Sequence, residues 1–364
     1  MQAETFNPVW LVIARQSRGK TQKDLAESLS VNQGWLSRIE GGLRTISEDK
    51  VKEVASLLNY PVEFFSQPDP PYLAGRTDVF HRKTSVPDKV LDRINGQLTI
   101  ISTAFEKLLQ GVEIDGTDME LVDLEDFHGS IEEIAQMIRS NWGVPRGPVK
   151  NLTQLIENAK AIIIPFDFGT RHIDAISFRL SNSRPVFFMN TSAPGDRLRF
   201  TLCHELGHMI MHQGVLRENK EDEANRFAAE FLMPAHQITP YLDNLSLGKL
   251  AALKLQWRVS MAALLKRAQT LSAITPAQAK RLWIQMSQYK QREPEELDIP
   301  IETPRLYKEI INAYQNELEY DVPELCKLLR LSENDTYHYF LEPPQYDIAK
   351  AAVEEAERLI RDNQ

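Results

Sequence analysis

The chain has 364 residues, which is enough for about two or three domains, and its 42% hydrophobic and 26% charged residues are typical of a globular protein. A formal net charge of −9 excludes a protein that coats nucleic acid non-specifically, so any DNA contact must come from a local patch. The apolar run from Val9 to Ala14 is too short for a signal sequence or a membrane span. The two cysteines, Cys203 and Cys326, form no CxxC pair, which favours a reducing compartment. We therefore expect a cytoplasmic protein with no membrane partner.

Residues 1–66 are expected to fold as a bundle of short helices. Asn7 and Pro8 are a capping residue and a proline at the first helical position, and they predict a helix that ends near Gln16. Residues 21–24 have the pattern of a capping box, and Asn32 is a good capping residue for the helix after it. Together with apolar residues at helical spacing, these signals predict further helices over residues 22–29, 33–40 and about 48–58.

The stretch from Thr21 to Gly41 resembles the helix-turn-helix of Xre/Cro phage-repressor proteins. A small residue, Ala26, stands where the two helices would cross, and Ile39 anchors the recognition helix. The resemblance implies a homodimer bound to operator DNA, and six basic minus three acidic side chains between Arg15 and Arg44 leave a local charge of +3. The alternative is a protein-docking module on the same fold. The side chains expected to face the major groove are Gln33, Ser37 and Arg38, and those expected near phosphates are Lys20, Gln22 and Arg44.

Residues 67–145 are expected to form a linker followed by a helical connector. Pro70 and Pro71 stand side by side and cannot continue a helix. Helices are predicted near residues 88–109 and 131–142. The acidic stretch 113–126 between them is expected to be a solvated loop, because it lacks the alternating oxygen ligands of a calcium loop.

Residues 146–290 carry the β character of the chain. The apolar run 161–166 and the runs 175–180 and 185–190, which flank a turn at 181–184, predict a small sheet. Prolines at 294, 300 and 304 then predict a break before a helical C-terminal region, residues 291–364. The expected fold class is mainly α (α+β), with a helix-turn-helix bundle, a sheet-containing domain and a helical C-terminal region.

The strongest chemical signal lies on a predicted helix that carries His204 and His208. These two residues are four apart, so they project from adjacent turns of one face and can share a metal ion, for which Zn²⁺ is expected. Glu205 lies one position round the helix, where it can take a proton from the attacking water and later pass it to the leaving amine. His212 lies about 12 Å along the helix from His204, which is too far to ligate the same ion.

A catalytic zinc site also needs a third protein ligand, commonly a carboxylate from another helix. Glu221 and Glu223 both stand at the start of such a predicted helix, which ends at Met233. We favour Glu221 because it shares a helix face with Asn225, four residues on, which can hydrogen-bond to the ligands from outside. Glu223 remains the rival ligand.

Four parts of the chain resemble the ImmA/IrrE metallopeptidases. They are the stretches 174–178, 221–234 and 254–268 and the run Arg199-Phe-Thr-Leu-Cys-His-Glu-Leu-Gly-His208. The resemblance implies a gluzincin-like, zinc-dependent endopeptidase domain. It implies cleavage of a repressor-type regulator, or of the chain itself, in the control of stress, mobile-element or defence genes. It places His204, His208 and Glu221 on the metal and makes Glu205 the general base. It names no group for the oxyanion, for which His172, His212, His236 and Tyr241 are all candidates.

Two other functions stay open at this point. One is a transcription factor whose metal site is a non-catalytic sensor, and the other is an antitoxin-like regulator that uses both domains to bind proteins. Glu205 favours catalysis, because a purely structural site needs no base and usually has a fourth protein ligand. The hairpin over 175–190 either pairs with an extended substrate or is an ordinary antiparallel pair.

Overall fold

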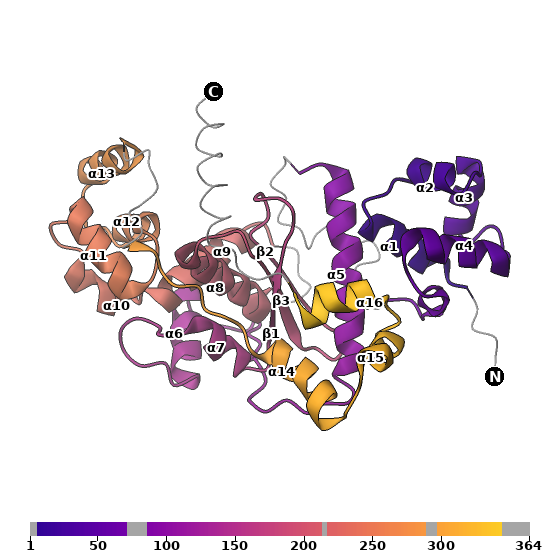
Figure 1. The fold of residues 1–364 in the computed structure, drawn as a ribbon. Coiled ribbons are helices and arrows are strands. Elements are labelled where there is room, and N and C mark those ends of the chain that lie inside the picture. Colours follow the sequence, from indigo (N-terminus) through magenta and orange to yellow (C-terminus); the bar gives the residue numbers. More distant parts are fainter. Residues whose placement is uncertain (1–5, 71–85, 213–216, 289–296, 344–364) are drawn as a thin grey trace. The chain divides into compact units, whose positions relative to one another are not determined.

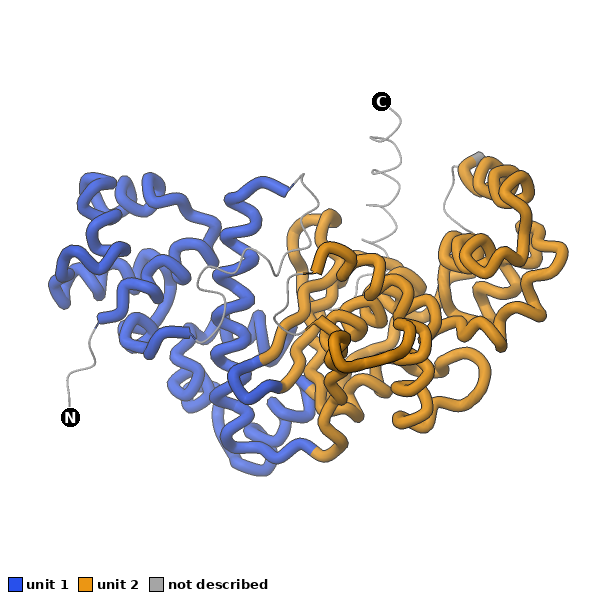
Figure 2. Tube along the Cα trace, turned by 180° about the vertical axis from the view of Figure 1, so that it is seen from behind, with its two compact units in different colours: residues 1–114, 180–183, 307–344 blue, residues 115–179, 184–306, 345–364 orange. Residues whose placement is uncertain are grey.

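The computed structural model describes residues 6–70, 86–212, 217–288 and 297–343 (Figure 1). The chain divides into two compact units, which are coloured separately in Figure 2. Unit 1 comprises residues 1–114, 180–183 and 307–344, and unit 2 comprises residues 115–179, 184–306 and 345–364. These units cut across the four segments expected from the sequence, because helices from the connector and from the C-terminal region join the N-terminal bundle in unit 1.

The N-terminal bundle has the helices that its capping signals predict. Asn7 accepts a hydrogen bond from the Val9 N–H at 3.0 Å, and Thr21 and Asp24 complete a capping box. The apolar faces meet in a small core that includes the fully buried Leu36. A short 3₁₀ helix, η1, was not predicted. The elements are α1 (Pro8–Ser17), α2 (Gln22–Ser28), α3 (Gln33–Glu40), α4 (Glu48–Leu58) and η1 (Val62–Ser66).

The first residues of the predicted linker are attached to this bundle. The indole N–H of Trp10 donates to the carbonyl of Pro68 at 2.8 Å, and the Asn7 amide donates to the carbonyl of Gln67 at 2.9 Å. Residues 67–70 are non-helical, as the prolines predict, while Pro71 lies outside the described residues.

Unit 1 is completed by α5 (Asp88–Leu108) and by helices from the C-terminal region. α5 packs against α1 so closely that a Cβ at Gly96 would lie 2.6 Å from the backbone nitrogen of Ser17. The ammonium group of Lys107, on α5, donates to Gln67 at 2.6 Å and to the carbonyl of Leu329 at 3.1 Å. The C-terminal elements are α14 (Leu306–Asn312), η4 (Ala313–Glu317), α15 (Val322–Leu329), α16 (Glu333–Thr336) and η5 (Tyr337–Leu341).

The sheet of unit 2 has three strands in the order β1-β3-β2. β1 (Ile162–Phe166) runs parallel to β3 (Pro185–Asn190), and β2 (Ala175–Arg179) runs antiparallel to β3 at an edge of the sheet. The strands and the hairpin agree with the sequence prediction. The short helix α7 (Leu152–Glu157) was not predicted, and the carboxylate of Glu302 accepts hydrogen bonds from the first two backbone N–H groups of this helix.

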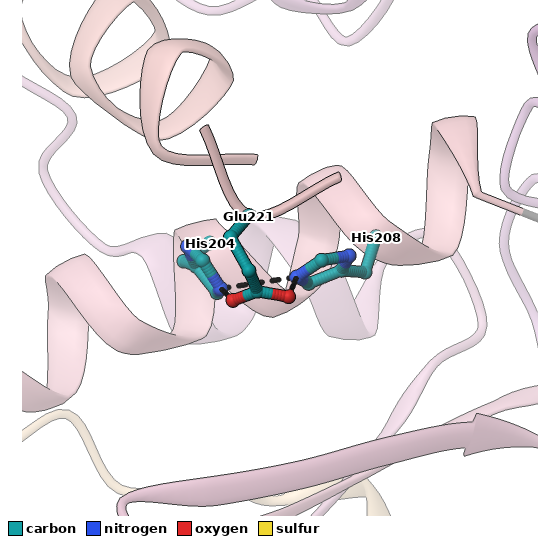
Figure 3. Close-up of side chains that lie close together, drawn as sticks. All are labelled: His204, His208 and Glu221. Carbon is teal, nitrogen blue, oxygen red and sulfur yellow. Dashed lines mark hydrogen bonds and ion pairs between the residues drawn. The ribbon is translucent and has the colours of Figure 1, made fainter. Parts of the chain in front are cut away.

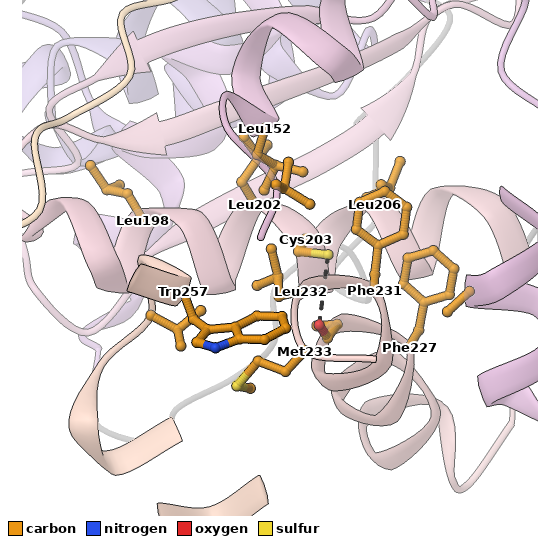
Figure 4. Close-up of a cluster of buried hydrophobic side chains, with 14 of the residues drawn as sticks. Leu152, Leu198, Leu202, Cys203, Leu206, Phe227, Phe231, Leu232, Met233 and Trp257 are labelled. Carbon is orange, nitrogen blue, oxygen red and sulfur yellow. Dashed lines mark hydrogen bonds between the residues drawn. The ribbon is translucent and has the colours of Figure 1, made fainter. Parts of the chain in front are cut away.

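The core of unit 2 is built around α8 (Gly195–Met211) and α9 (Lys220–Leu232) and also includes Leu152 of α7 and Trp257, as Figure 4 shows. A Cβ at Gly207 would lie 3.3 Å from the Ala224 Cα and 3.1 Å from the Phe227 ring, so small residues bring the two helices together. No helix among the described residues is long and apolar enough to cross a membrane. The remaining elements are α6 (Ile131–Asn141), α10 (Ala235–Ile238), η2 (Thr239–Tyr241), α11 (Leu247–Trp257), α12 (Met261–Thr270) and α13 (Pro276–Gln288).

Candidate metal centre

His204 and His208 lie on adjacent turns of α8, and their Nε2 atoms are 3.0 Å apart. Glu221, in the first turn of α9, places its carboxylate against both rings, with Oε2 3.5 Å from the His204 Nε2 and Oε1 3.6 Å from the His208 Nε2. Figure 3 shows the carboxylate spanning the two imidazoles. One ligand atom from each of the three residues lies within 4.8 Å of the other two, which is close enough for a shared ion.

The donor set fits a zinc ion with an open coordination position. Two imidazole nitrogens and one carboxylate oxygen are a common protein ligand set of catalytic zinc, whereas structural zinc sites usually have four protein ligands. The Nδ1 atoms of both rings have hydrogen-bond partners of their own, so the Nε2 lone pairs are directed to the common position. The Glu221 side chain is 49% exposed, so the cluster is open to solvent on that side.

Glu205 is buried beside the cluster, and its position depends on the sheet. Its Oε2 accepts a hydrogen bond from the hydroxyl of Ser177, which lies in β2. Ala175, Ser177 and Arg179 alternate along one face of that strand, and Arg179 donates to the carbonyl of Met209 on α8 at 3.0 Å. Ser177 is not among the site residues predicted from the sequence. A polar residue within an otherwise largely apolar strand was the only local signal of its role.

The two acidic residues that competed for the metal have different surroundings. Glu221 faces the histidine pair, whereas Glu223 accepts a hydrogen bond from the Nε2 of His212 at 2.9 Å and lies 3.5 Å from the Arg217 guanidinium. Burial lowers the pKa of His212, and the hydrogen bond to Glu223 opposes that shift. The structure therefore places Glu221 at the candidate metal position and Glu223 behind His212.

Asn225, which was predicted to support the metal ligands, lies beside one of them. Its Oδ1 is 3.1 Å from the Nδ1 of His204.

The oxyanion candidates are scattered over unit 2. His172 is exposed ahead of β2, His236 is exposed on α10, and Tyr241 is exposed in η2 against Trp257. His212 has both ring nitrogens engaged, which makes it a poor candidate.

The predicted DNA-contacting residues are divided between exposed and engaged side chains. Gln33, Ser37 and Arg38 are exposed on α3, and Arg44 is exposed with its guanidinium 5.9 Å from the Trp35 ring. Lys20 is half-buried.

Gln22, which the sequence predicts near the phosphates, has a hydrogen-bond partner within the bundle. Its amide donates to the carboxylate of Glu40 at 2.8 Å, and Arg15 pairs with the same carboxylate at 2.6 Å. Glu40 is already subtracted in the sequence count of +3, but Arg18 pairs with Asp335, which lies outside the counted range. The basic patch is therefore smaller than the sequence count of charges indicates.

Comparisons with known families agree with the two resemblances seen in the sequence. Residues 157–269 match the family model of the IrrE N-terminal-like domain, in peptidase family M78, and residues 11–65 match a helix-turn-helix model. No curated protein is similar enough to this chain to count as a match. The peptidase-type match includes all three strands, both helices of the metal cluster and most of α12. The chain thus combines a DNA-binding type of domain with a peptidase-type domain, in that order.

Proposed function

We propose that this chain is a DNA-binding transcriptional regulator with zinc-dependent endopeptidase activity, which cleaves a repressor-type partner protein or itself. The observation that carries the proposal is the buried Glu205 next to the convergent His204, His208 and Glu221. Three ligands and an adjacent carboxylate form the minimal set for metal-assisted hydrolysis, and a purely structural site has no use for the fourth group.

The protein groups around the cluster have separable tasks in peptide hydrolysis. When bound, a zinc ion supplies Lewis acidity at the scissile carbonyl. Glu205 accepts the proton of the attacking water and later donates it to the leaving amine. The hydroxyl of Ser177 holds the Oε2 of Glu205, which leaves Oε1 to receive the proton.

The edge strand β2 supports an extended peptide as the substrate. The N–H of Asn190 donates to the carbonyl of Asp174 at 2.9 Å, so these two residues are a hydrogen-bonded pair. Along an antiparallel hairpin, hydrogen-bonded pairs alternate with pairs that are not hydrogen-bonded. By that alternation, Ile176 and Phe178 exchange backbone hydrogen bonds with β3, and the backbone groups of Ser177 are directed away from it. A peptide that pairs with this edge lies beside the residue that holds Glu205, so the strand aligns the scissile bond with the base.

The DNA-binding part of the proposal rests on α3. Its exposed Gln33, Ser37 and Arg38 are suited to base edges in the major groove, while Lys20 and Arg44 are suited to phosphates. The proposed partner is a palindromic operator bound by a homodimer of the chain. Gln22 contributes only if its amide exchanges Glu40 for a phosphate.

The decisive experiment compares wild type with Glu205→Gln in a strain that carries the regulated promoter as a reporter. The amide keeps the shape of the side chain and leaves the three ligands intact, but it cannot accept a proton at neutral pH. We expect retained zinc, and loss of the general-base contribution of about 10²–10⁴-fold in cleavage rate. A shortened partner band and derepression should appear with wild type and be absent with Glu205→Gln.

The matched control is Glu125→Gln, which makes the same chemical change at an exposed loop position of unit 2. This variant should cleave like wild type. Equal regulation by wild type and Glu205→Gln, without a cleavage product, would instead establish a non-catalytic sensor.

A further inference from the structure

Three side chains form a continuous hydrogen-bonded chain that ends at one of the candidate metal ligands. The Nδ1 of His208 lies 2.8 Å from the Nδ1 of His212, and the Nε2 of His212 lies 2.9 Å from the Oε2 of Glu223. The other nitrogen of His208, Nε2, faces His204 and Glu221. The chain therefore runs from a carboxylate through two imidazoles to the metal position.

Only one arrangement of protons satisfies this chain when His208 binds a metal through Nε2. That nitrogen must offer its lone pair, so the proton of His208 sits on Nδ1 and is donated to the Nδ1 of His212. The His212 Nδ1 then accepts, so its own proton sits on Nε2 and is donated to Glu223. Each group has a defined role as donor or acceptor, and the ring of His208 is held in the tautomer that a metal requires.

The second histidine of the pair is supported differently. His204 has its Nδ1 next to the Oδ1 of Asn225 at 3.1 Å, and Asn225 is exposed. By contrast, the side chains of His212 and Glu223 are 3% and 13% exposed. A carboxylate acting through a buried imidazole is screened less by water than an exposed amide, so His208 has the stronger support.

We propose that His212 and Glu223 are positioning residues for zinc: they fix the tautomer and orientation of His208 and place negative charge behind its ring, and so raise the affinity of the site. The inference rests on the proposed zinc site. It gives a role to Glu223, which is not at the metal position, and to His212, which contacts the ligand His208 and not the ion. Partners of this kind typically change metal affinity by about 10–100-fold.

The test measures zinc affinity of the full chain by competition with a chromogenic chelator, using zinc alone as the probe. We expect His212→Ala to weaken zinc binding by about 10–100-fold, Glu223→Gln by about tenfold, and Asn225→Ala by less than either. Glu223→Gln is the conservative variant, since its amide oxygen still accepts from His212 and only the charge is lost. The unfolding temperature of each variant in excess EDTA shows whether the metal-free fold is intact.

A double variant tests whether Glu223 acts through His212. Once His212 is alanine, the additional change Glu223→Gln should cost almost nothing, because the two residues work as one chain. Arg217→Gln is the control for the other contact of Glu223, at 3.5 Å, and should leave zinc affinity unchanged.

The outcomes separate this inference from the function on which it rests. A wild-type chain that binds no zinc contradicts the proposed metallopeptidase itself. Wild-type zinc binding that is unchanged in Glu223→Gln and His212→Ala overturns the positioning role alone. Additive losses in the double variant also overturn it, because Glu223 would then act independently of His212. An equal loss in Arg217→Gln overturns it as well, because the effect of Glu223 would then come from its pair with Arg217.

Discussion

The guanidinium of Arg18 lies against both carboxylate oxygens of Asp335, with donor–acceptor distances of 2.8 and 2.6 Å, although 317 residues separate the two. Arg18 also donates to the carbonyl of Leu58 at 2.8 Å and covers the Tyr60 ring at 4.1 Å. A residue at the end of the first helix of the DNA-binding bundle is thus held by a helix near the other end of the chain. The bundle is stabilised by more than its own 66 or so residues.

Removal of the Asp335 carboxylate should destabilise unit 1. Asp335 is buried, so Asp335→Ala leaves the guanidinium of Arg18 without its charged partner and should cost about 2–3 kcal/mol. Hydrogen exchange of the α1 to α4 amides measures this loss locally. Lys23→Ala, which removes an exposed pair with Glu27, is the control and should change stability by less than about 0.5 kcal/mol. Equal protection in both variants would contradict a stabilising role of the long-range pair.

Stability should rise with pH above about pH 8 because of Lys107. Burial, with a smaller contribution from Arg330, lowers the pKa of Lys107 to about 8. The unfolded chain, with a lysine pKa near 10.4, binds one more proton than the folded chain between these values, so the free energy of unfolding increases by at most about 1.4 kcal/mol per pH unit.

Urea titrations at pH 8, 9 and 10 measure this slope. Lys107→Met should flatten it, whereas Lys52→Met, at an exposed position, should not. An unchanged slope in Lys107→Met would show that the ammonium is not desolvated.

Ser177→Ala should reduce the cleavage rate without emptying the metal site. The hydroxyl fixes one oxygen of Glu205, so its loss lets the carboxylate rotate away from the attacking water, at a cost of about tenfold in kcat. Zinc content and KM should stay close to those of wild type. Ser177→Thr keeps a hydroxyl in a strand position and should retain most of the activity. A full rate in Ser177→Ala would mean that the packing around Glu205 is sufficient to position it.

The purified protein should contain about one zinc ion per chain, because two imidazoles and a carboxylate are sufficient protein ligands for a catalytic site. His204→Ala, His208→Ala and Glu221→Ala should each lower the zinc content to near zero in metal analysis after dialysis. The competing assignment makes the opposite prediction, since it requires Glu223→Ala to empty the site while Glu221→Ala keeps it filled.

Variants of the DNA-binding bundle should separate base contacts from phosphate contacts. Gln33→Ala should cost about 1–3 kcal/mol at the operator and little on unrelated DNA. Lys20→Ala should weaken both and reduce the salt slope by about one. Binding isotherms of the full chain at several salt concentrations supply both quantities, with the exposed Lys308→Ala as control. Wild-type binding that does not distinguish any promoter-derived fragment from unrelated DNA would favour the protein-docking alternative.

Local chemistry explains why much of the chain was predictable. Capping residues and apolar spacing act within a few positions, so the limits of α1, α3 and α4 follow from the sequence to within one residue. The four-residue spacing of His204 and His208 likewise specifies a shared helix face before any tertiary contact exists.

Other relationships depend on elements that are distant in sequence. Glu221 and Glu223 stand in the same helical turn with similar chemistry, and only the position of α9 against α8 decides which carboxylate faces the histidines. The helix α7 is too short to be marked by periodicity, and its first N–H groups bond to Glu302, 150 residues away in sequence for the first of them.

The hydrogen-bond and ion-pair partners of several polar residues also depend on tertiary packing and could not be predicted from the sequence. Gln22 resembles a phosphate contact in the sequence, but the fold brings Glu40 to its amide. The sequence gives no sign that Ser177 contacts Glu205, because the contact depends on the pleat of β2, which directs the Ser177 side chain toward α8. Arg18 counts as part of a basic patch in the sequence, but in the structure it is paired with Asp335. The residues that can form helices, and the side chains that can bind a metal, are predictable from the sequence because those properties are local. The orientation of each side chain and the charges around it depend on which distant elements pack together, so they follow from the tertiary structure.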